Sequence, residues 1–171
     1  MSGSGKASAH ASAGDVSFLV DTNVWIDFFV DRSRRHEEAV DFIVVAQTRG
    51  VVLFTPIGAT KDIYYIVASE LKRMQLEEAG VVTESSARAA DEVAWSCLSA
   101  VRKRSTVLGA DSSDMIEAMV QRAAHGDYED NLIVAAAMRA RASHIITSDV
   151  QLQRHSPIPC VSIAEACALI A

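Results

Sequence analysis

Short apolar runs alternate along the chain with longer stretches in which apolar residues recur every three or four positions. The runs predict buried strands at 16–20, 51–55, 107–108, 144–147 and 161–163. The longer stretches predict helices at 24–29, 36–48, 59–79, 85–104, 111–124 and 130–141, with one more after the last strand. This alternation indicates a parallel sheet with helices on both faces. The expected fold class is therefore α/β, a three-layer α/β/α sandwich with a short-stranded parallel sheet.

The first fifteen residues, MSGSGKASAHASAGD, are small and polar and show neither pattern. A chain of 171 residues favours a single domain, so we expect a flexible N-terminal tail over 1–15 and one folded domain over 16–171. The tail lacks the apolar stretch of a secretory signal peptide. No apolar run approaches the roughly 18 residues that a membrane span needs, so no membrane segment is expected.

The cysteines and the net charge argue against a zinc site and against a simple DNA-binding module. Cys97, Cys160 and Cys167 form no CxxC pair, and the histidines are scattered, so no close ligand pair suited to zinc is present. We expect buried, reduced thiols in a cytoplasmic protein. The formal net charge of −6 argues against a simple DNA-binding module, but it is compatible with an acidic metal pocket and local basic patches.

Aspartates follow the predicted strands or begin the helices beside them. Asp21 directly follows the first strand, and Asp149 directly follows the strand at 144–147. Asp62 lies early in the helix after the second strand, and Asp127 and Asp130 enter the helix at 130–141. Taken singly, each could be a helix cap or a turn residue. Parallel strands end at one edge of a sheet, so the topology can bring the five carboxylates together.

Several carboxylates at one edge repel one another unless a cation binds there. All-oxygen ligands suit Mg²⁺ or Mn²⁺, and carboxylate-held metals activate water and stabilise charge on a phosphodiester. The sequence contains no P-loop, GxGxxG or GxSxG motif and no recognisable pairing of a serine nucleophile with a histidine base. The residues therefore favour metal-assisted phosphodiester hydrolysis.

Four segments resemble the PIN-domain family of metal-dependent ribonucleases: LVDTNVWIDFF at 19–29, TKDIYY at 60–65, DYEDNLIVAAAMRARASHIITSD at 127–149, and the ending PCVSIAEACALI. The resemblance implies a Rossmann-like α/β/α fold and a Mg²⁺ or Mn²⁺ site of three or four acids. By position, these acids are Asp21, Asp62, Asp130 and Asp149, with Asp127 as a candidate fifth. In many family members the second acid is a glutamate further along its helix. Glu70 is therefore the alternative to Asp62.

Two polar residues match family positions beside the first and last acids. Asn23 and Thr147 would orient carboxylates or water, and hydrogen bonds that only close the turns are the alternative.

Basic residues near the first acid are the candidates for RNA contacts. Arg32, Arg34 and Arg35 form the basic cluster closest in sequence to Asp21, which makes them the first candidates for contacts to RNA phosphates. Single-stranded or looped RNA is favoured over a duplex, because cleavage needs an accessible backbone.

Stand-alone PIN domains of this size resemble VapC-like toxins of type II toxin–antitoxin pairs. The resemblance implies inhibition by a small antitoxin and a homodimer. In the helical hairpin at 59–104, Tyr64, Tyr65 and Met74 would bind a partner helix or pack in the core. Two other functions stay open. A non-catalytic PIN-like module that binds protein or RNA predicts a broken acid set. A DNA-directed, flap-type nuclease predicts additional acids and a DNA-binding helical element.

Overall fold

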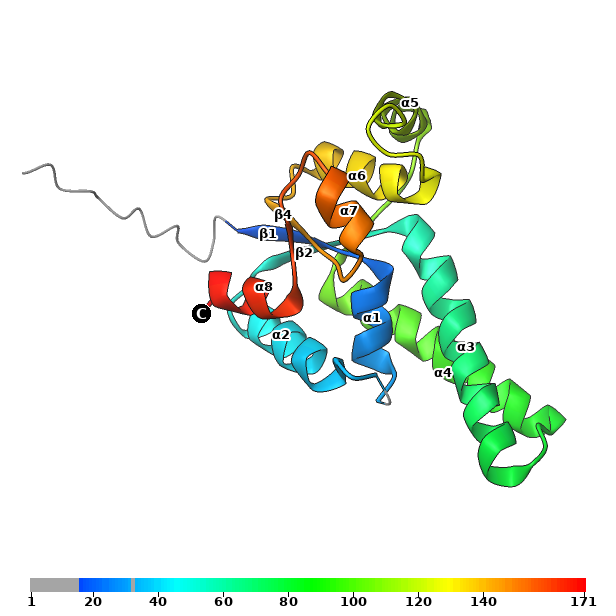
Figure 1. Ribbon diagram of the computed structural model, residues 1–171. Coiled ribbons are helices and arrows are strands. Elements are labelled where there is room, and N and C mark those ends of the chain that lie inside the picture. Colours follow the sequence, from blue (N-terminus) through cyan, green and yellow to red (C-terminus); the bar gives the residue numbers. More distant parts are fainter. Residues whose placement is uncertain (1–15, 32) are drawn as a thin grey trace, which may run out of the picture.

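A computed structural model describes residues 16–31 and 33–171, and its centre is a five-stranded parallel sheet (Figure 1). The strands lie in the order β3-β2-β1-β4-β5. Their bounds are β1 Ser17–Val20, β2 Val52–Pro56, β3 Thr106–Leu108, β4 His144–Ile146 and β5 Cys160–Val161. In the central register, Leu19 of β1 lies opposite Phe54 of β2 and Ile145 of β4. The N-terminal tail predicted over 1–15 lies outside the described residues, and so does Arg32.

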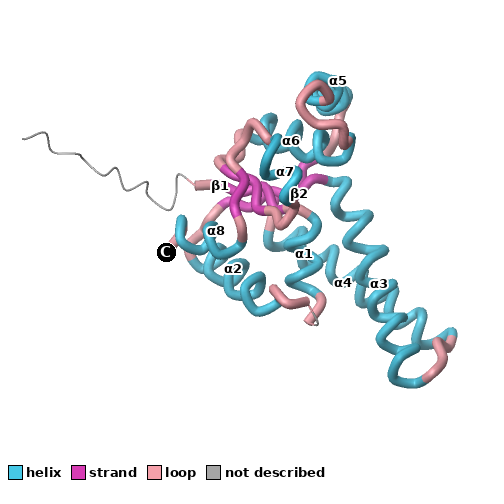
Figure 2. The backbone as a smooth tube through the Cα atoms, viewed as in Figure 1, coloured by secondary structure: helices cyan, strands magenta, loops and turns pink. Residues whose placement is uncertain are grey.

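Helices cover both faces of the sheet, which confirms the predicted α/β/α architecture (Figure 2). The helices are α1 Thr22–Phe29, α2 His36–Thr48, α3 Ile57–Ala79, α4 Glu84–Arg104, α5 Ser112–Gln121, α6 Tyr128–Ala140, α7 Val150–His155 and α8 Ile163–Leu169. Successive strand side chains point to opposite faces. Phe18 and Val20 accordingly pack with α1, α2, α3, α4 and α8, whereas Leu19 packs with α6 and α7. Helix α5 packs against α6.

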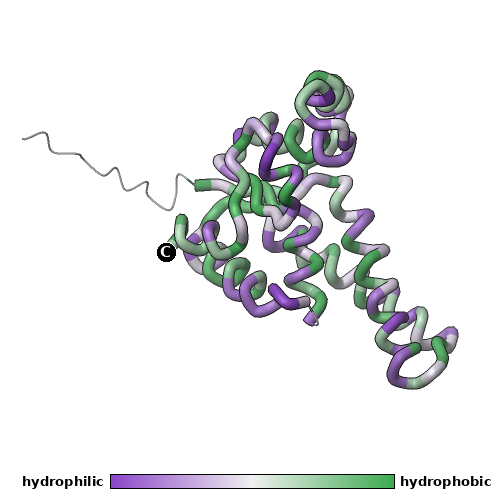
Figure 3. The backbone as a smooth tube through the Cα atoms, in the orientation of Figure 1, coloured by the Kyte–Doolittle hydropathy of each residue, from purple (hydrophilic) through white to green (hydrophobic). Residues whose placement is uncertain are grey.

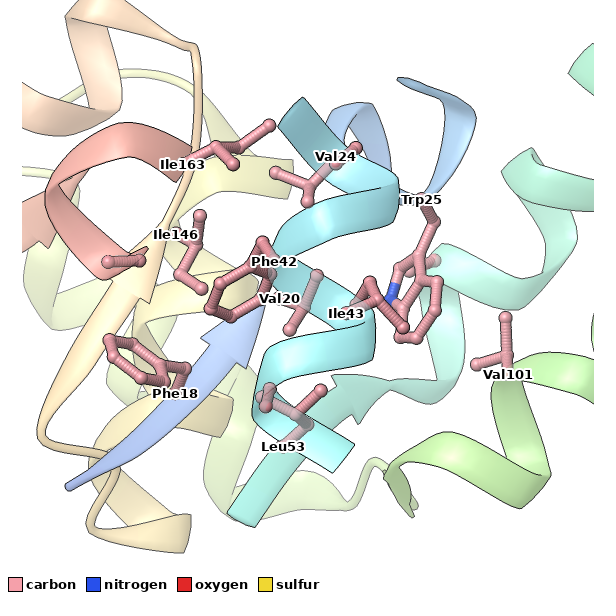
Figure 4. Packing of buried hydrophobic residues seen from close by; sticks show 14 of the residues in the cluster. Phe18, Val20, Val24, Trp25, Phe42, Ile43, Leu53, Val101, Ile146 and Ile163 are labelled. Atoms are coloured by element: carbon pink, nitrogen blue, oxygen red, sulfur yellow. The ribbon is translucent and has the colours of Figure 1, made fainter. Parts of the chain in front are cut away.

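The larger core lies on the α1–α2 side of the sheet (Figure 4). The Phe18 ring meets the edge of Phe42 of α2, with ring centroids 5.7 Å apart. Trp25 of α1 is fully buried, and its Nε1 donates a hydrogen bond to Thr55 Oγ1 at 3.1 Å. Burial of side chains of this size stabilises the fold by about 1.5–3 kcal/mol each. This core fixes α1 against the sheet, and so it fixes the residues at the junction of β1 and α1.

Helices α3 and α4 form a long hairpin whose far end projects away from the sheet (Figure 1). Gly80 ends α3 in the left-handed conformation, at φ 71°, which a glycine adopts without strain. A capping box between Thr83 and Ser86 begins α4. Apolar residues concentrate in the strands, while the hairpin mixes apolar and polar residues along its length (Figure 3). No helix among the described residues is long and apolar enough to cross a membrane.

Some local predictions are wrong. The six-residue helix α7 was not predicted, because so short a segment shows no helical period. The helix predicted over 111–124 ends at Gln121, and Ile163 begins α8 instead of ending the last strand. Over 85–104 the apolar spacing predicts an inward stripe of Ala89, Val93, Cys97, Ala100 and Val101. Cys97 and Val101 are buried as predicted, but Ala89 and Val93 are exposed, Val93 to 46%, and Ala90 and Ala94 are buried in their place. These small residues let α4 pack closely on α3, so in the first half of α4 the buried face lies one residue further along.

The aromatic residues and methionine singled out in the hairpin, and the three cysteines, differ in how far their side chains are buried. Tyr65 is exposed, while Tyr64 and Met74 are partly buried. Cys97 is buried as predicted, but Cys160 and Cys167 are only partly buried, and all three are free thiols.

Candidate active site

The candidate site lies where the strand order reverses direction. The chain runs outward from β1 through β2 to β3 and then crosses to β4 on the other side of β1. Ligands in open α/β sheets bind at the carboxyl ends of the strands at such a switch point. Asp21 directly follows β1 and Thr147 directly follows β4. The Asp21 backbone N–H also donates to Ile146 O at 3.1 Å, so the two strand ends are held together.

Asp21 is the best-anchored carboxylate of the site. Its side chain is the N-cap of α1 and accepts a hydrogen bond from the Thr22 backbone N–H at 2.6 Å. Its other oxygen accepts from Asn23 Nδ2 at 2.5 Å and from Thr147 Oγ1 at 2.6 Å. Thr147 Oγ1 also accepts from the Asp149 backbone N–H at 2.9 Å. Both predicted polar neighbours therefore hold Asp21 in place, and Thr147 links it to the turn that carries Asp149.

The pKa of Asp21 is raised above its ordinary value, chiefly because the residue is buried and only 6% exposed. The hydrogen bonds from Thr147 and Thr22 oppose this rise because they stabilise the charged form. Repulsion from Asp130 and Asp149 adds to the rise. The negative charges at this edge thus act on one another across three separate segments of the chain.

The remaining predicted acids begin helices that point toward the same edge. Asp127 is the N-cap of α6, and Asp149 is the N-cap of α7. Asp130, in the first turn of α6, is hydrogen-bonded to His125 Nε2 at 2.9 Å. Burial and repulsion from Asp149 and Asp127 raise the pKa of Asp130, and the bond to His125 opposes that rise. Asp62 lies in the second turn of α3, where Lys61 Nζ approaches its Oδ1 at 3.2 Å.

These residues converge on one open cavity of about 560 Å³. Seven carboxylate residues and one cation line it: Asp21, Asp27, Asp62, Asp127, Glu129, Asp130, Asp149 and Arg35. The five predicted acids are all present. Glu70 lies elsewhere, in a different pocket beside Val67 and Leu71, and pairs with Arg73. Of the predicted arginines, Arg35 lines the cavity, whereas exposed Arg34 does not.

The donor set suits a hard divalent cation, but it is not arranged as a closed cage. Within the described part of the chain, no group of three or more His, Cys, Asp or Glu residues is placed so that it could hold a metal ion. Hydrogen bonds engage one oxygen in each of Asp127, Asp130 and Asp149. Carboxylate oxygens are the ligands that Mg²⁺ and Mn²⁺ prefer. The chemistry of these residues therefore fits such an ion, and binding would require the carboxylates to draw closer.

Sequence reasoning missed three residues of the cavity region. Glu129 is hydrogen-bonded to Asp62, and this bond is the main cause of its raised pKa. Asp27 lines the cavity from α1, one helical turn after Asn23, and its Oδ2 is buried without a hydrogen-bond partner. His125 stacks on His155 with ring centroids 4.9 Å apart. The spacing of Asp27 from Asn23 was the available signal, because residues four apart share a helix face.

Comparisons with known proteins agree with this architecture. The family model for the PIN domain matches residues 17–151. No curated protein matches the chain in sequence.

Several solved structures share the fold at low sequence identity. One is VapBC2 from Rickettsia felis bound to a DNA fragment from their promoter, with a TM-score of 0.61 and 10% identity over 86% of this chain and 98% of that chain. DNA-bound VapBC from Salmonella typhimurium has a TM-score of 0.59 and 16% identity, with the same coverage of both chains. VapC20 of Mycobacterium tuberculosis, described as a toxin that cleaves the sarcin-ricin loop, has a TM-score of 0.50 and 16% identity over 81% and 94%.

Proposed function

The chain belongs to the PIN-domain family, and from this premise we propose that it is a ribonuclease that hydrolyses RNA phosphodiester bonds with Mg²⁺ or Mn²⁺. The observation that carries the proposal is the convergence of seven carboxylate residues on one cavity at the switch point of the sheet. So dense a set of like charges destabilises a fold unless it serves a cation. The proposed domain spans 16–171.

The proposed ligands are Asp21, Asp62, Asp130 and Asp149, with Asp127 as a candidate fifth. A divalent cation bound by them would supply a Lewis acid that lowers the pKa of water and stabilises charge on the phosphodiester. Asn23 and Thr147 act through Asp21, because their hydrogen bonds fix the direction of its carboxylate. Asp62 is favoured over Glu70 because only Asp62 lines the acidic cavity.

The substrate must bring a phosphodiester into a cavity of the same charge. Arg35 is the cationic residue that lines this cavity among the described residues, so it is the first candidate for a contact to an RNA phosphate. Arg34 and Arg32, which are close to Arg35 in sequence, would add long-range attraction. The open cavity suits a single-stranded or looped backbone, whose phosphates are accessible.

The wider biological role in this proposal is that of a toxin held inactive by a small antitoxin. Its support is the fold shared with VapBC and VapC structures. The antitoxin would bind the α3–α4 hairpin, where Tyr65 is exposed and contacts Tyr64. A homodimer and a cytoplasmic location complete the proposal, and free cysteines suit a reducing compartment.

A second candidate function is a non-catalytic PIN-like module that binds RNA or protein. The observation that favours it is the lack, among the described residues, of a carboxylate group placed to hold a metal. This candidate predicts RNA or protein binding that is indifferent to divalent cations.

Cleavage of a mixed pool of structured RNAs, with Mn²⁺, Mg²⁺ or EDTA, tests the proposal. We expect metal-dependent cleavage by the wild type and a loss of more than about 100-fold in Asp21→Asn, since removal of outer-shell partners alone costs roughly 10–100-fold. Asp91→Asn is the matched control, because Asp91 lies on α4, pairs with Lys72 and does not line the cavity. Equal cleavage by wild type and Asp21→Asn would contradict the assigned site.

A further inference from the structure

A second cavity, of about 350 Å³, lies directly beside the acidic one. The two share five lining residues: Asp21, Thr22, Asp62, Glu129 and Ile133. The second cavity opens between the carboxyl ends of β2 and β3, the start of α3 and the first turns of α6. One continuous molecule could therefore occupy both cavities and contact the proposed catalytic carboxylates that line them.

The chemistry of the second cavity differs sharply from that of the first. Apolar side chains dominate its wall, among them Leu108, Leu132 and Ala136. Tyr128 and Ile57 also line it, and they are 54% and 45% exposed although both are large and apolar in character. Exposed apolar side chains gathered around a hollow indicate a binding site for an apolar group.

Two glycines in the wall of this cavity have free space beside them. A Cβ atom added at Gly58 or Gly109 would meet no heavy atom within 4 Å, and both residues line the cavity. The volume falls within the range of about 300–1,000 Å³ typical of sites for small organic ligands. The cavity is thus large enough for one flat ring system and its sugar.

We propose that this cavity binds the base of the nucleotide next to the phosphodiester that is cleaved, with the base stacked on Tyr128. The inference rests on the proposed ribonuclease function and adds a subsite to it. The shared wall argues for a nucleobase, because the occupant is then covalently continuous with a phosphate in the acidic cavity. Lys61 lines the second cavity and its Nζ lies 3.2 Å from Oδ1 of Asp62, which lines both cavities, so it is placed to meet the intervening phosphate. Apolar walls and one stacking ring accept any base, so the subsite selects unpaired nucleotides more than a sequence.

Binding of single-stranded RNA, measured apart from cleavage, tests this subsite. The probes are fluorescein-labelled pentaribonucleotides, one set with all bases and one with a central abasic site, titrated in EDTA and followed by anisotropy. Gly58→Leu fills the cavity and removes a glycine from a helix, so the fold should tolerate it. Tyr128→Ala removes the stacking ring, and Tyr128→Phe keeps it. Ala79→Leu is the control, since it places the same leucine side chain at an exposed position of α3.

We expect Gly58→Leu and Tyr128→Ala to weaken binding of the intact pentamer about tenfold or more, the usual effect of losing one stacked base. Tyr128→Phe and Ala79→Leu should bind like the wild type, and the abasic pentamer should bind all five proteins weakly. The inference is overturned if Gly58→Leu binds as the wild type does, or if the wild type does not distinguish the two pentamers. Base-dependent binding without metal-dependent cleavage would leave the subsite standing and reject the nuclease, so the two failures are distinguishable.

Discussion

Replacement of Thr147 by valine probes how the protein holds the charge of Asp21. Thr147 is 1% exposed, and its hydroxyl donates to Asp21 Oδ2 at 2.6 Å and accepts from the Asp149 backbone N–H at 2.9 Å. Valine keeps the shape and removes the hydroxyl. A hydrogen bond to a charged group contributes roughly 1.5–3 kcal/mol, and a buried N–H left without an acceptor costs about 1–3 kcal/mol. We therefore expect Thr147→Val to lower the free energy of unfolding by about 3 kcal/mol at neutral pH.

The pH dependence of this loss identifies its cause. The Thr147 hydrogen bond lowers the pKa of Asp21 because it favours the carboxylate, so its removal raises that pKa further. The stability that Thr147 contributes through the charged form is full above the pKa of Asp21. It is lost as the pH falls through that pKa, which burial already holds above the ordinary value. The difference between wild type and Thr147→Val should therefore shrink as the pH decreases from neutral through the raised pKa of Asp21.

Urea unfolding in EDTA at several pH values measures this difference. Thr55→Val is the matched control, because Thr55 is also fully buried and its hydroxyl bonds Trp25 Nε1 at 3.1 Å and Ser105 Oγ at 2.7 Å. These partners are uncharged, so the cost of Thr55→Val should not change with pH. A loss in Thr147→Val that is the same at both ends of the pH range, like that of the control, would refute the reasoning.

Three further predictions follow from the placement of charged residues. Asp62→Asn should reduce metal-dependent RNA cleavage by about 100-fold, whereas Glu70→Gln should keep it, because only Asp62 lines the acidic cavity; initial rates decide between them. Arg35→Gln should reduce the slope of log Kd against log salt for RNA binding by about 1, and Arg34→Gln should change it less, because Arg34 lies outside the cavity. Asp114→Ala should lower the free energy of unfolding by about 3 kcal/mol, measured in urea, because it removes the buried partner of the bidentate ion pair between α5 and α6.

The sequence predicted which residues lie at the carboxyl edge of the sheet. Asp21 and Thr147 directly follow β1 and β4, so their place at one edge follows from hydrophobic periodicity and the rule for parallel strands. The strand order, which no local pattern specifies, makes β1 and β4 neighbours and brings the two side chains into contact. Asp127 and Asp149 were also interpretable, because an aspartate before a helix has the geometry of an N-cap. Because aspartate is a common N-cap residue, this geometry by itself does not distinguish an aspartate of the site from one that only caps a helix.

The parts that escaped prediction depend on how helices rotate and pack. The bond between Asp62 and Glu129 joins α3 to α6, two helices whose relative rotation no local pattern specifies. Likewise, the difference between Arg34 and Arg35 is set by the path of one loop. The inward face of α4 was predicted correctly at Cys97 and Val101 but one residue off in the first half of the helix, because alanines carry too weak a hydrophobic signal to distinguish Ala89 from Ala90.

The central claim is that the carboxylates at the switch point hold a divalent cation, and Mn²⁺ binding followed by electron paramagnetic resonance tests it most directly. The wild type should bind Mn²⁺ near neutral pH, where the carboxylates are ionised, and lose it as the pH falls through the raised pKa values of Asp21 and Asp130. Asp21→Asn should bind at least about tenfold more weakly, and Asp91→Asn should bind like the wild type. No binding by the wild type, or equal binding by wild type and Asp21→Asn, would contradict the account.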